Sequence, residues 1–441
     1  MTPSAPLSAP SLAREPGELR GSIKTPAGAT LLQRLLVFVG PGYLVATGYM
    51  DPGNWATALA GGSKYGTALL FVAVLSSLMA IVLQALAARL GLGAGLDLAQ
   101  ACRAQFSRPT AVALWLIAEA AILATDLAEI IGTAIGLQLL FGLPLAAGIV
   151  ITLLDTFLVL AFERAGFRKI ELFVVALLGL IALSFTAQLA MAHVNFGDVA
   201  RGLLPTKQFF ADPQMLYIGL GIIGATVMPH NLFLHSYIVQ TRAVGASSDE
   251  KREAIRFAVI DSSVALFFAL IVNGAILVLA ASVFFASGHR DVAELGEAYR
   301  LIAPLLGAPT AATLFALALI ACGLNSTVTA TLAGQVVMEG FVRLRMKPAL
   351  RRFVTRLMAI APAVGLTLYA GESATGHLLV ASQVVLSMAL PFAVAPLIWF
   401  TASRRIMGEQ VAPRFLTITA WVIAAMIMAL NAKLLVDMIF G

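Results

Sequence analysis

Long apolar segments recur along the whole chain, and they constrain its fold more than any other feature. Apolar residues make up 60% and charged residues 12% of the 441 residues, which excludes an ordinary soluble protein. A helix that crosses a membrane needs roughly 20 apolar residues. The sequence predicts eleven such helices, over residues 35–60, 66–90, 110–138, 144–163, 170–193, 213–243, 254–286, 308–340, 347–369, 374–401 and 411–440. We therefore expect an all-α integral membrane protein in a lipid bilayer.

These helices leave no room for a soluble domain. Residues 31–441 are predicted to form a single transmembrane domain, preceded by a Pro-, Ser- and Ala-rich tail over residues 1–30 that we expect to be disordered. The tail lacks the apolar region and cleavage site of a signal peptide. The two cysteines, Cys102 and Cys322, differ in their expected surroundings. They predict neither a disulfide nor a metal motif.

Basic residues gather on one side of the predicted topology. If the N-terminus is cytoplasmic, 23 of the 29 lysines and arginines lie in or beside cytoplasmic segments. Such a bias sets the orientation of a membrane protein. It predicts a cytoplasmic N-terminus and an external C-terminus. It also accounts for the net charge of +6, so we expect no nucleic-acid partner.

The first predicted helix contains Asp51-Pro52-Gly53-Asn54 at its centre. Proline removes a backbone donor and glycine weakens helical preference, so we expect the helix to break here. Broken backbone at mid-membrane depth occurs only where it is buried in protein or lines a cavity. An ionisable side chain there indicates a functional site. The simpler alternative is a proline kink with a partnered aspartate.

The third predicted helix carries three acids in an otherwise apolar segment, at Glu119, Asp126 and Glu129. Their spacing places them within roughly 80° of one helix face. Acids on one face of a membrane helix are typical of a proton relay. The alternative is a set of buried acids that are protonated or neutralised by arginine. The fourth helix carries Asp155, for which we favour a structural pairing with an arginine of a neighbouring helix.

The sixth predicted helix repeats the anomaly of the first. Its centre reads Ala225-Thr226-Val227-Met228-Pro229-His230, where proline again interrupts the helix. Broken helices at positions one and six are typical of an inverted repeat of five plus five helices, with the binding site between them at the midplane. The repeats would cover about 35–193 and 213–401, and residues 411–440 would form a further helix.

The side chains at the two breaks indicate the ligand. Asp51 and Asn54 supply hard oxygens, and Pro229 frees the carbonyl of Ala225. Met228 supplies a thioether, a soft ligand that suits transition metals better than Mg²⁺ or Ca²⁺. Mixed ligands indicate Mn²⁺ or Fe²⁺, although packing is the commonest use of methionine. His230 is placed better for protons than for metal.

The two motifs resemble the signature motifs of the Nramp family, which are Asp51-Pro52-Gly53-Asn54 and Ala225-Thr226-Val227-Met228-Pro229-His230 in this chain. Ala124-Thr125-Asp126-Leu127-Ala128-Glu129 resembles the family's third-helix motif, and Ser382-Gln383 resembles its tenth-helix glutamine. The resemblance covers residues 35 to 440. It implies the LeuT-type fold and proton-coupled import of divalent metal ions into the cytoplasm, across the bacterial inner membrane.

The resemblance also implies the roles of individual residues. The metal ligands would be Asp51, Asn54, Ala225 and Met228, with Gln383 joining in some conformations. The proton route would fall on Asp51, Glu119, Asp126, Glu129 and His230. A helix-nine arginine would pair with Asp126, and we favour Arg352 over Arg351 and Arg356.

The expected activity is that of a carrier that works by alternating access, not of an enzyme. Its substrates would be Mn²⁺, Fe²⁺ and protons, and we expect no cofactor and no obligate protein partner. An amino-acid symporter could share the broken helices, but Asp51 would repel a carboxylate substrate. An intramembrane metal hydrolase would need a His-Glu-x-x-His spacing. His230 and His235 are five apart with no glutamate between them.

Overall fold

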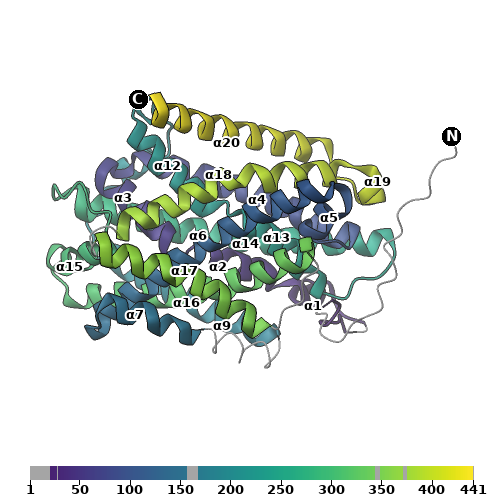
Figure 1. Ribbon diagram of the computed structural model, residues 1–441, viewed down its shortest axis with the longest axis horizontal. Coiled ribbons are helices and arrows are strands. Elements are labelled where there is room, and N and C mark those ends of the chain that lie inside the picture. The colour runs from purple at the N-terminus through teal and green to yellow at the C-terminus, as the bar shows by residue number, and fades with distance from the viewer. Residues whose placement is uncertain (1–19, 27, 156–166, 343–347, 371–374, 441) are drawn as a thin grey trace.

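The computed structural model describes residues 20–26, 28–155, 167–342, 348–370 and 375–440. Within these ranges all regular elements are helices, apart from an isolated parallel bridge between Ile23 and Arg242. Figure 1 shows the long helices running along the longest dimension of the molecule, with α20 along one edge. Nine described helices or broken helices are long and apolar enough to cross a membrane, and two shorter apolar helices accompany them. The predicted membrane class is confirmed, while the count of eleven spans stays a prediction.

The first predicted span is built from three helices instead of one. Helices α1 (Leu31–Phe38) and α2 (Pro41–Gly48) precede the break, and α3 (Pro52–Tyr65) follows it. Asp51 is the N-cap of α3, and its Oδ1 accepts a hydrogen bond from the Asn54 backbone N–H at 2.9 Å. Proline at the first helical position suits a helix start, because its missing N–H is not needed there. The break is observed at Tyr49–Asp51, slightly earlier than the expected Asp51–Asn54, because Pro52, Gly53 and Asn54 already form the first turn of α3.

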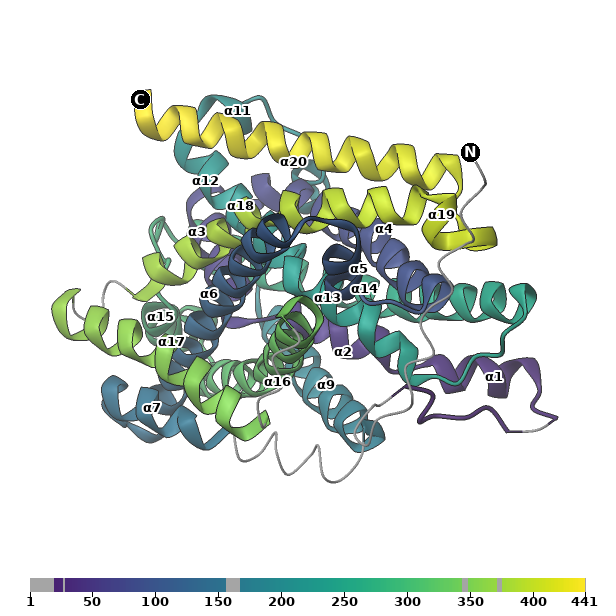
Figure 2. The same cartoon turned by 45° about the vertical axis from the view of Figure 1, so that its right-hand side comes forward.

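The sixth predicted span is broken in the same way. Helix α12 (Pro213–Thr226) ends before Val227 and Met228, and α13 (Pro229–Ile238) begins at the proline. A 3₁₀ turn, η3 (Val239–Thr241), extends α13. Both predicted breaks are confirmed, each immediately before a proline. In Figure 2, α2 and α13 lie inside the bundle among longer helices.

Unbroken helices enclose these four half-helices. Helix α14 contacts α2, α3 and α4, helix α18 contacts α3, α6 and α12, and helix α16 contacts α6, α9 and α13. The remaining helical elements are η1 (Gly66–Leu69), α4 (Leu70–Ala94), α5 (Leu98–Gln105), α6 (Arg108–Phe141), α7 (Leu145–Ile151), η2 (Thr152–Leu154), α9 (Phe167–Met191), α10 (Phe196–Gly202), α11 (Gln208–Ala211), α14 (Ser248–Ala280), a π-helical turn η4 (Ala281–Phe285), α15 (Leu295–Leu306), α16 (Pro309–Val342), α17 (Pro348–Ala370), α18 (Thr375–Ala402), α19 (Arg404–Met407), η6 (Gly408–Gln410) and α20 (Arg414–Phe440).

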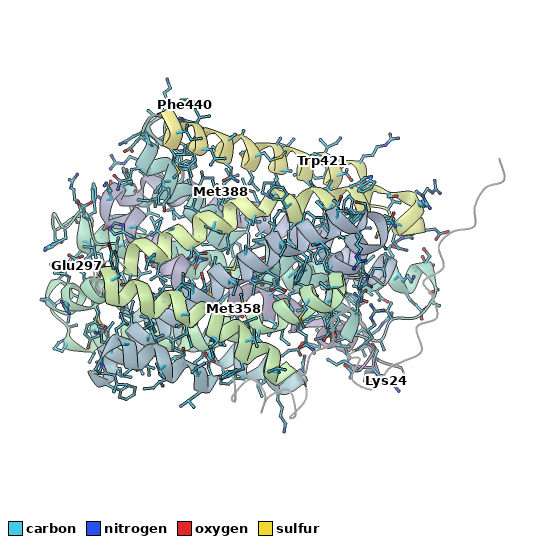
Figure 3. The ribbon with its side chains drawn as sticks, in the orientation of Figure 1. Lys24, Glu297, Met358, Met388, Trp421 and Phe440 are labelled. Carbon is cyan, nitrogen blue, oxygen red and sulfur yellow. The ribbon has the colours of Figure 1, made fainter. Side chains whose placement is uncertain are left out.

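Apolar side chains fill the interior of the bundle and also cover much of its outer surface. Trp55 is fully buried, and its ring lies 4.7 Å from that of Phe185 and 5.3 Å from that of Phe315. Trp421 and Phe440 lie on the outer edge along α20 (Figure 3), and Phe440 is 82% exposed. Large exposed apolar side chains on an outer helix suit a surface that faces lipid.

The segment before α1 is attached to the rest of the chain. The Gly21 and Ile23 N–H groups donate to the carbonyls of Gln240 (2.9 Å) and Thr241 (3.0 Å). Arg242, whose side chain is fully buried, donates to Glu171 at 2.8 Å and to the carbonyls of Val37 and Val39 at 3.0 Å each. Gly21 and Ile23, which fall within the tail expected to be disordered, are thus held by backbone hydrogen bonds to the segment that follows α13. Residues 1–19 and 27 lie outside the described residues.

Candidate functional site

The two helix breaks meet in the interior. The Asn54 side chain donates from Nδ2 to the carbonyl of Tyr49, within its own break, and faces the carbonyl of Ala225 in the other break at 3.4 Å. From the side, Gln383 of α18 brings its Nε2 to 3.4 Å from Asp51 Oδ2. Four of the predicted metal ligands thus lie in one network that joins α3, α12 and α18.

The carbonyl groups at this point are available for a ligand because the helices end here. Pro229 has no N–H, so the carbonyl of Ala225, four residues earlier, lacks its helical donor. Helices α2 and α12 both end at the site, and the C-terminus of a helix carries a partial negative charge of roughly half an elementary charge. The N-termini of α3 and α13 lie at the same breaks and carry the opposite partial charge, so the groups that favour a cation are the Asp51 carboxylate and the carbonyl of Ala225.

The predicted ligands are closed off from solvent in this conformation. Asp51, Ala225, Met228 and Gln383 are each 0% exposed, and Asn54 is 2% exposed. No group of three or more His, Cys, Asp or Glu residues with metal-binding geometry occurs in the described part of the chain. The groups that the structure brings together are the Asp51 carboxylate, the amides of Asn54 and Gln383 and the carbonyl of Ala225, and their role as metal ligands stays a prediction.

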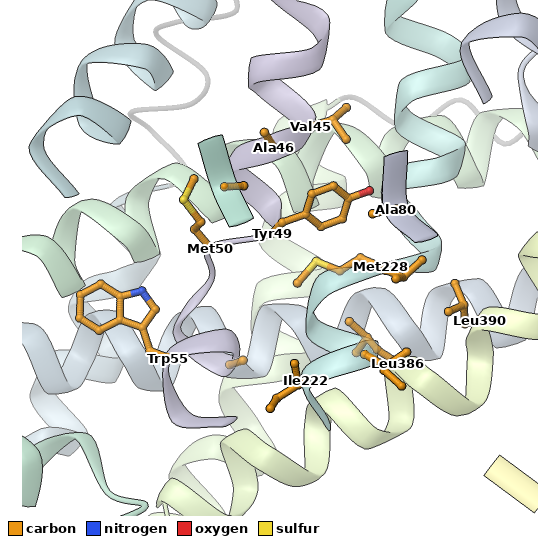
Figure 4. Close-up of a cluster of buried hydrophobic side chains, with 14 of the residues drawn as sticks. Val45, Ala46, Tyr49, Met50, Trp55, Ala80, Ile222, Met228, Leu386 and Leu390 are labelled. Carbon is orange, nitrogen blue, oxygen red and sulfur yellow. The ribbon is translucent and has the colours of Figure 1, made fainter. Parts of the chain in front are cut away.

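Met228 occupies the corner between the two breaks. Its sulfur lies 3.6 Å from Nδ2 of Asn231. The same nitrogen would be 2.5 Å from a Cβ placed on Gly48, so the end of α2 lies directly against this group. Figure 4 shows the Met228 side chain and Tyr49 in the region where α2 gives way to α3. A side chain at position 48 would therefore overlap the Asn231 amide beside Met228.

Sequence reasoning missed several polar groups that hold the break in place. Asn273 of α14 donates to the Tyr49 carbonyl at 2.8 Å, and the Tyr49 hydroxyl hydrogen-bonds Gln84 of α4. Cys322 of α16 donates its thiol to the carbonyl of Met50 at 2.5 Å. The available signal was a single amide in each of two apolar helices, at Gln84 and Asn273. A polar group there requires a buried partner.

The acids of the third span differ in burial and in their described partners. Asp126 and Glu129 of α6 are buried, and both lie near the guanidinium of Arg356, whose Nη1 is 3.7 Å from Asp126 and 3.6 Å from Glu129. Glu119 is only partly buried, and its Oε1 accepts from the Trp115 indole at 3.0 Å. Asp126 and Glu129 thus share a described arginine neighbour.

Among the described side chains, Arg356 is an arginine that lies beside Asp126, with its Nη1 at 3.7 Å from Asp126 Oδ1. The side chains of Arg351 and Arg352 lie outside the described residues, so the expected pairing of Arg352 with Asp126 stays a prediction. The expected arginine partner of Asp155 is confirmed, and it is again Arg356.

His230 lies between the second break and the acids. Its Nδ1 is 3.5 Å from the hydroxyl of Thr125, which is next to Asp126 on α6. Its Nε2 makes no hydrogen bond within the described part of the chain. His230 therefore reaches the helix that carries Asp126 and Glu129, as a proton-transfer role requires, while no described contact links it to Met228.

Comparison with known proteins places the chain among membrane transporters. Residues 42–437 match the family model described as natural resistance-associated macrophage protein-like, Nramp. The divalent metal cation transporter MntH of Agrobacterium fabrum is 57% identical over 95% of this chain and 91% of its own length. MntH of Listeria monocytogenes is 50% identical over 97% of this chain and 94% of its own.

Solved structures agree with the sequence relatives. The manganese transporter of Eremococcus coleocola superposes with a TM-score of 0.86 at 41% identity, covering 94% of this chain and 89% of that one. The nucleobase-cation-symport transporter Mhp1 superposes with a TM-score of 0.61 over 90% of both chains, at 16% identity, and shares the fold alone. These neighbours confirm the LeuT-type fold with broken helices one and six.

Proposed function

This chain belongs to the Nramp family, and from that premise we propose that it imports divalent transition-metal ions, Mn²⁺ and also Fe²⁺, together with protons. The relatives and the solved neighbour are named for divalent metal and manganese transport. Such an activity makes the chain a carrier in a membrane and not an enzyme. No covalent step is required of any residue.

One observation carries the proposal. The carboxylate of Asp51 is fully buried at the first helix break, and the described contacts give it neutral partners only, the Asn54 N–H and the Gln383 amide. A buried charge is tolerated when it is paired or coordinates a metal. A dication held by Asp51, Asn54 and the carbonyl of Ala225 would supply the missing positive charge.

The choice of metal rests on Met228. A thioether adds little to the binding of Mg²⁺ or Ca²⁺, which take oxygen ligands and water. It is compatible with the softer first-row ions. Mn²⁺ is the leading candidate because the solved neighbour is described as a manganese transporter, and Fe²⁺ shares its charge and accepts the same ligands.

Proton coupling is supported by the groups beside the site. Metal binding requires deprotonated ligands, so an arriving dication expels a proton from the site. His230, 3.5 Å from Thr125 on α6, lies in a position to receive it and to pass it to Asp126 and Glu129. An inside-negative potential favours inward movement of both ions by about 2.3 kcal/mol per charge per 100 mV.

Alternating access is supported by the closure of the site. All five candidate ligands are at most 2% exposed, so an ion cannot exchange with water without movement of the half-helices. In the inverted-repeat carriers this movement is a rocking of one bundle against the other. We place the protein in the bacterial inner membrane with its N-terminus in the cytoplasm, as the basic-residue bias requires.

The test is uptake into liposomes that contain the purified full chain. An internal metal-sensitive dye and an internal pH dye record Mn²⁺ and proton uptake together, with Fe²⁺, Cd²⁺, Ca²⁺ and Mg²⁺ as competitors. Labelled amino acids are offered to the same vesicles as the alternative substrate. We expect Fe²⁺ and Cd²⁺ to compete, Ca²⁺ and Mg²⁺ not to compete, and acid outside to stimulate uptake.

Two results would contradict the proposal. Amino-acid uptake without metal uptake would assign the fold to a different substrate class. Metal uptake with no accompanying proton uptake, at any imposed pH gradient, would refute proton coupling but would still support metal import.

A further inference from the structure

Asn231 is a fully buried amide in the first turn of α13, just after the second break. It follows Met228, the N-cap residue of this helix, by three positions, and it is 0% exposed. Its amide lies against the last residue of α2, because a Cβ on Gly48 would be 2.5 Å from its Nδ2 and 3.1 Å from its Oδ1. Asn231 therefore lies where the end of α2 meets the start of α13.

The amide of Asn231 contacts a sulfur atom instead of the backbone. A Glu or Gln at this position often reaches back to the backbone N–H of the N-cap residue. Here Nδ2 of Asn231 donates to the sulfur of Met228, 3.6 Å away. A thioether sulfur can only accept a hydrogen bond, so the amide nitrogen and not its oxygen faces it. The hydrogen bond thus gives the sulfur a fixed neighbour on its own helix.

A fixed position matters for a methionine ligand more than for most others. The methionine side chain has three rotatable bonds and adapts to irregular spaces. A side chain that becomes ordered on binding loses this freedom, which reduces the affinity. A hydrogen bond that orders the sulfur beforehand removes part of the loss. Hydrogen bonds to metal ligands commonly orient them in this way.

We propose that Asn231 is a positioning residue for the sulfur of Met228 and thereby contributes to the preference for soft over hard divalent ions. The inference rests on the proposed function, in which Met228 is a metal ligand. The simpler interpretation is that Asn231 only packs α13 against the end of α2. The two differ in one respect, because only positioning makes the affinity for soft ions depend on Asn231 more than the affinity for harder ions.

Asn231→Leu separates the two interpretations. Leucine keeps the branched shape of the side chain but cannot donate a hydrogen bond. Cd²⁺ is softer than Mn²⁺ and depends more on the thioether. We expect the dissociation constant for Cd²⁺, measured by calorimetry on the purified full chain, to rise about fivefold, equivalent to ~1 kcal/mol. The dissociation constant for Mn²⁺ is expected to stay within about twofold.

Two further comparisons separate positioning from packing. In a Met228→Ala background no sulfur remains to be positioned, so adding Asn231→Leu is expected to change the affinities for Cd²⁺ and Mn²⁺ by the same factor. Asn325→Leu is the matched control in the parent protein. Asn325 of α16 is 1% exposed, and its amide donates to the carbonyl of Val174 at 3.4 Å. This control is expected to leave the ratio of the two affinities unchanged.

Three results would overturn the proposal: an unchanged ratio of Cd²⁺ to Mn²⁺ affinity in folded Asn231→Leu, a tighter binding of Cd²⁺, or the same selective loss in the Met228→Ala background. If Asn231→Leu does not fold, Asn231→Ala decides by the same criteria, because it removes the amide without adding bulk. Failure of the proposed function is distinguishable, since the parent protein would then bind neither ion.

Discussion

Gly224→Ala tests how closely α18 must approach the second break. A Cβ on Gly224 would lie 1.9 Å from the backbone oxygen of Gln383 and 2.7 Å from the backbone nitrogen of Ser387. Ordinary contact begins at 3.4 Å, so α18 would have to withdraw by about 1.5 Å. Neither atom belongs to a flexible side chain, so rotation cannot relieve the overlap.

The size of the effect follows from this overlap. Overpacking a buried site costs typically about 1–3 kcal/mol, and the better helix propensity of alanine returns up to ~1 kcal/mol. Withdrawal of α18 also carries the Gln383 amide away from Asp51, which it approaches to 3.4 Å. We expect a lower unfolding temperature and about tenfold weaker Mn²⁺ binding, equivalent to ~1.4 kcal/mol.

The measurement is Mn²⁺ calorimetry on the purified protein together with thermal unfolding in the same detergent. Gly179→Ala is the matched control, because Gly179 is also inside a long helix but a Cβ there meets no atom within 4 Å. It is expected to leave affinity unchanged. If Gly224→Ala binds Mn²⁺ as tightly as the control, the close approach of α18 has no bearing on the metal site.

Three further predictions concern the site and its acids. Met228→Ala is expected to retain Mn²⁺ transport but to let Ca²⁺ compete, since the thioether alone discriminates against hard ions; dye-reported uptake that still excludes Ca²⁺ would refute this. Asp51→Ala should abolish Mn²⁺ binding in calorimetry and Asn54→Ala should weaken it strongly, because the first removes the only anionic ligand; binding that survives in Asp51→Ala would move the site elsewhere. Glu129→Gln should depress proton uptake far more than metal binding, and more cleanly than Asp126→Asn, with internal pH and metal recorded together; unchanged proton uptake would make these acids structural.

The two helix breaks could be predicted from the sequence because their cause is local. Pro52 and Pro229 each lack an N–H, and that property acts within one helical turn whatever surrounds it. The types of the predicted ligands likewise follow directly from the side chains near each proline. That the two breaks face each other was a weaker inference, because it rested only on their recurrence in the first and sixth predicted spans. The 3.4 Å approach of Asn54 to the carbonyl of Ala225 bears this out.

Contacts between distant elements were harder to predict. The 3.7 Å approach of Arg356 to Asp126 depends on how α17 packs against α6, and the sequence alone does not give that packing. Asn273 carries no motif, because a lone amide gives no information about its partner, here the carbonyl of Tyr49. The pairing of Ile23 with Thr241 is a backbone contact that side-chain patterns do not encode.

The position of Arg242 has a consequence for how the protein can move. Its guanidinium holds the carbonyls of Val37 and Val39, just before α2, while its own backbone continues directly from α13 and η3. Helices α2 and α13 are thereby tied together at their ends away from the two breaks. A tilt of α2 and α13 together keeps these bonds, whereas a swing of α2 alone breaks the two bonds to Val37 and Val39 and leaves the buried guanidinium with Glu171 and Thr241 only. A joint tilt of α2 and α13 is therefore a less costly movement than a swing of α2 alone.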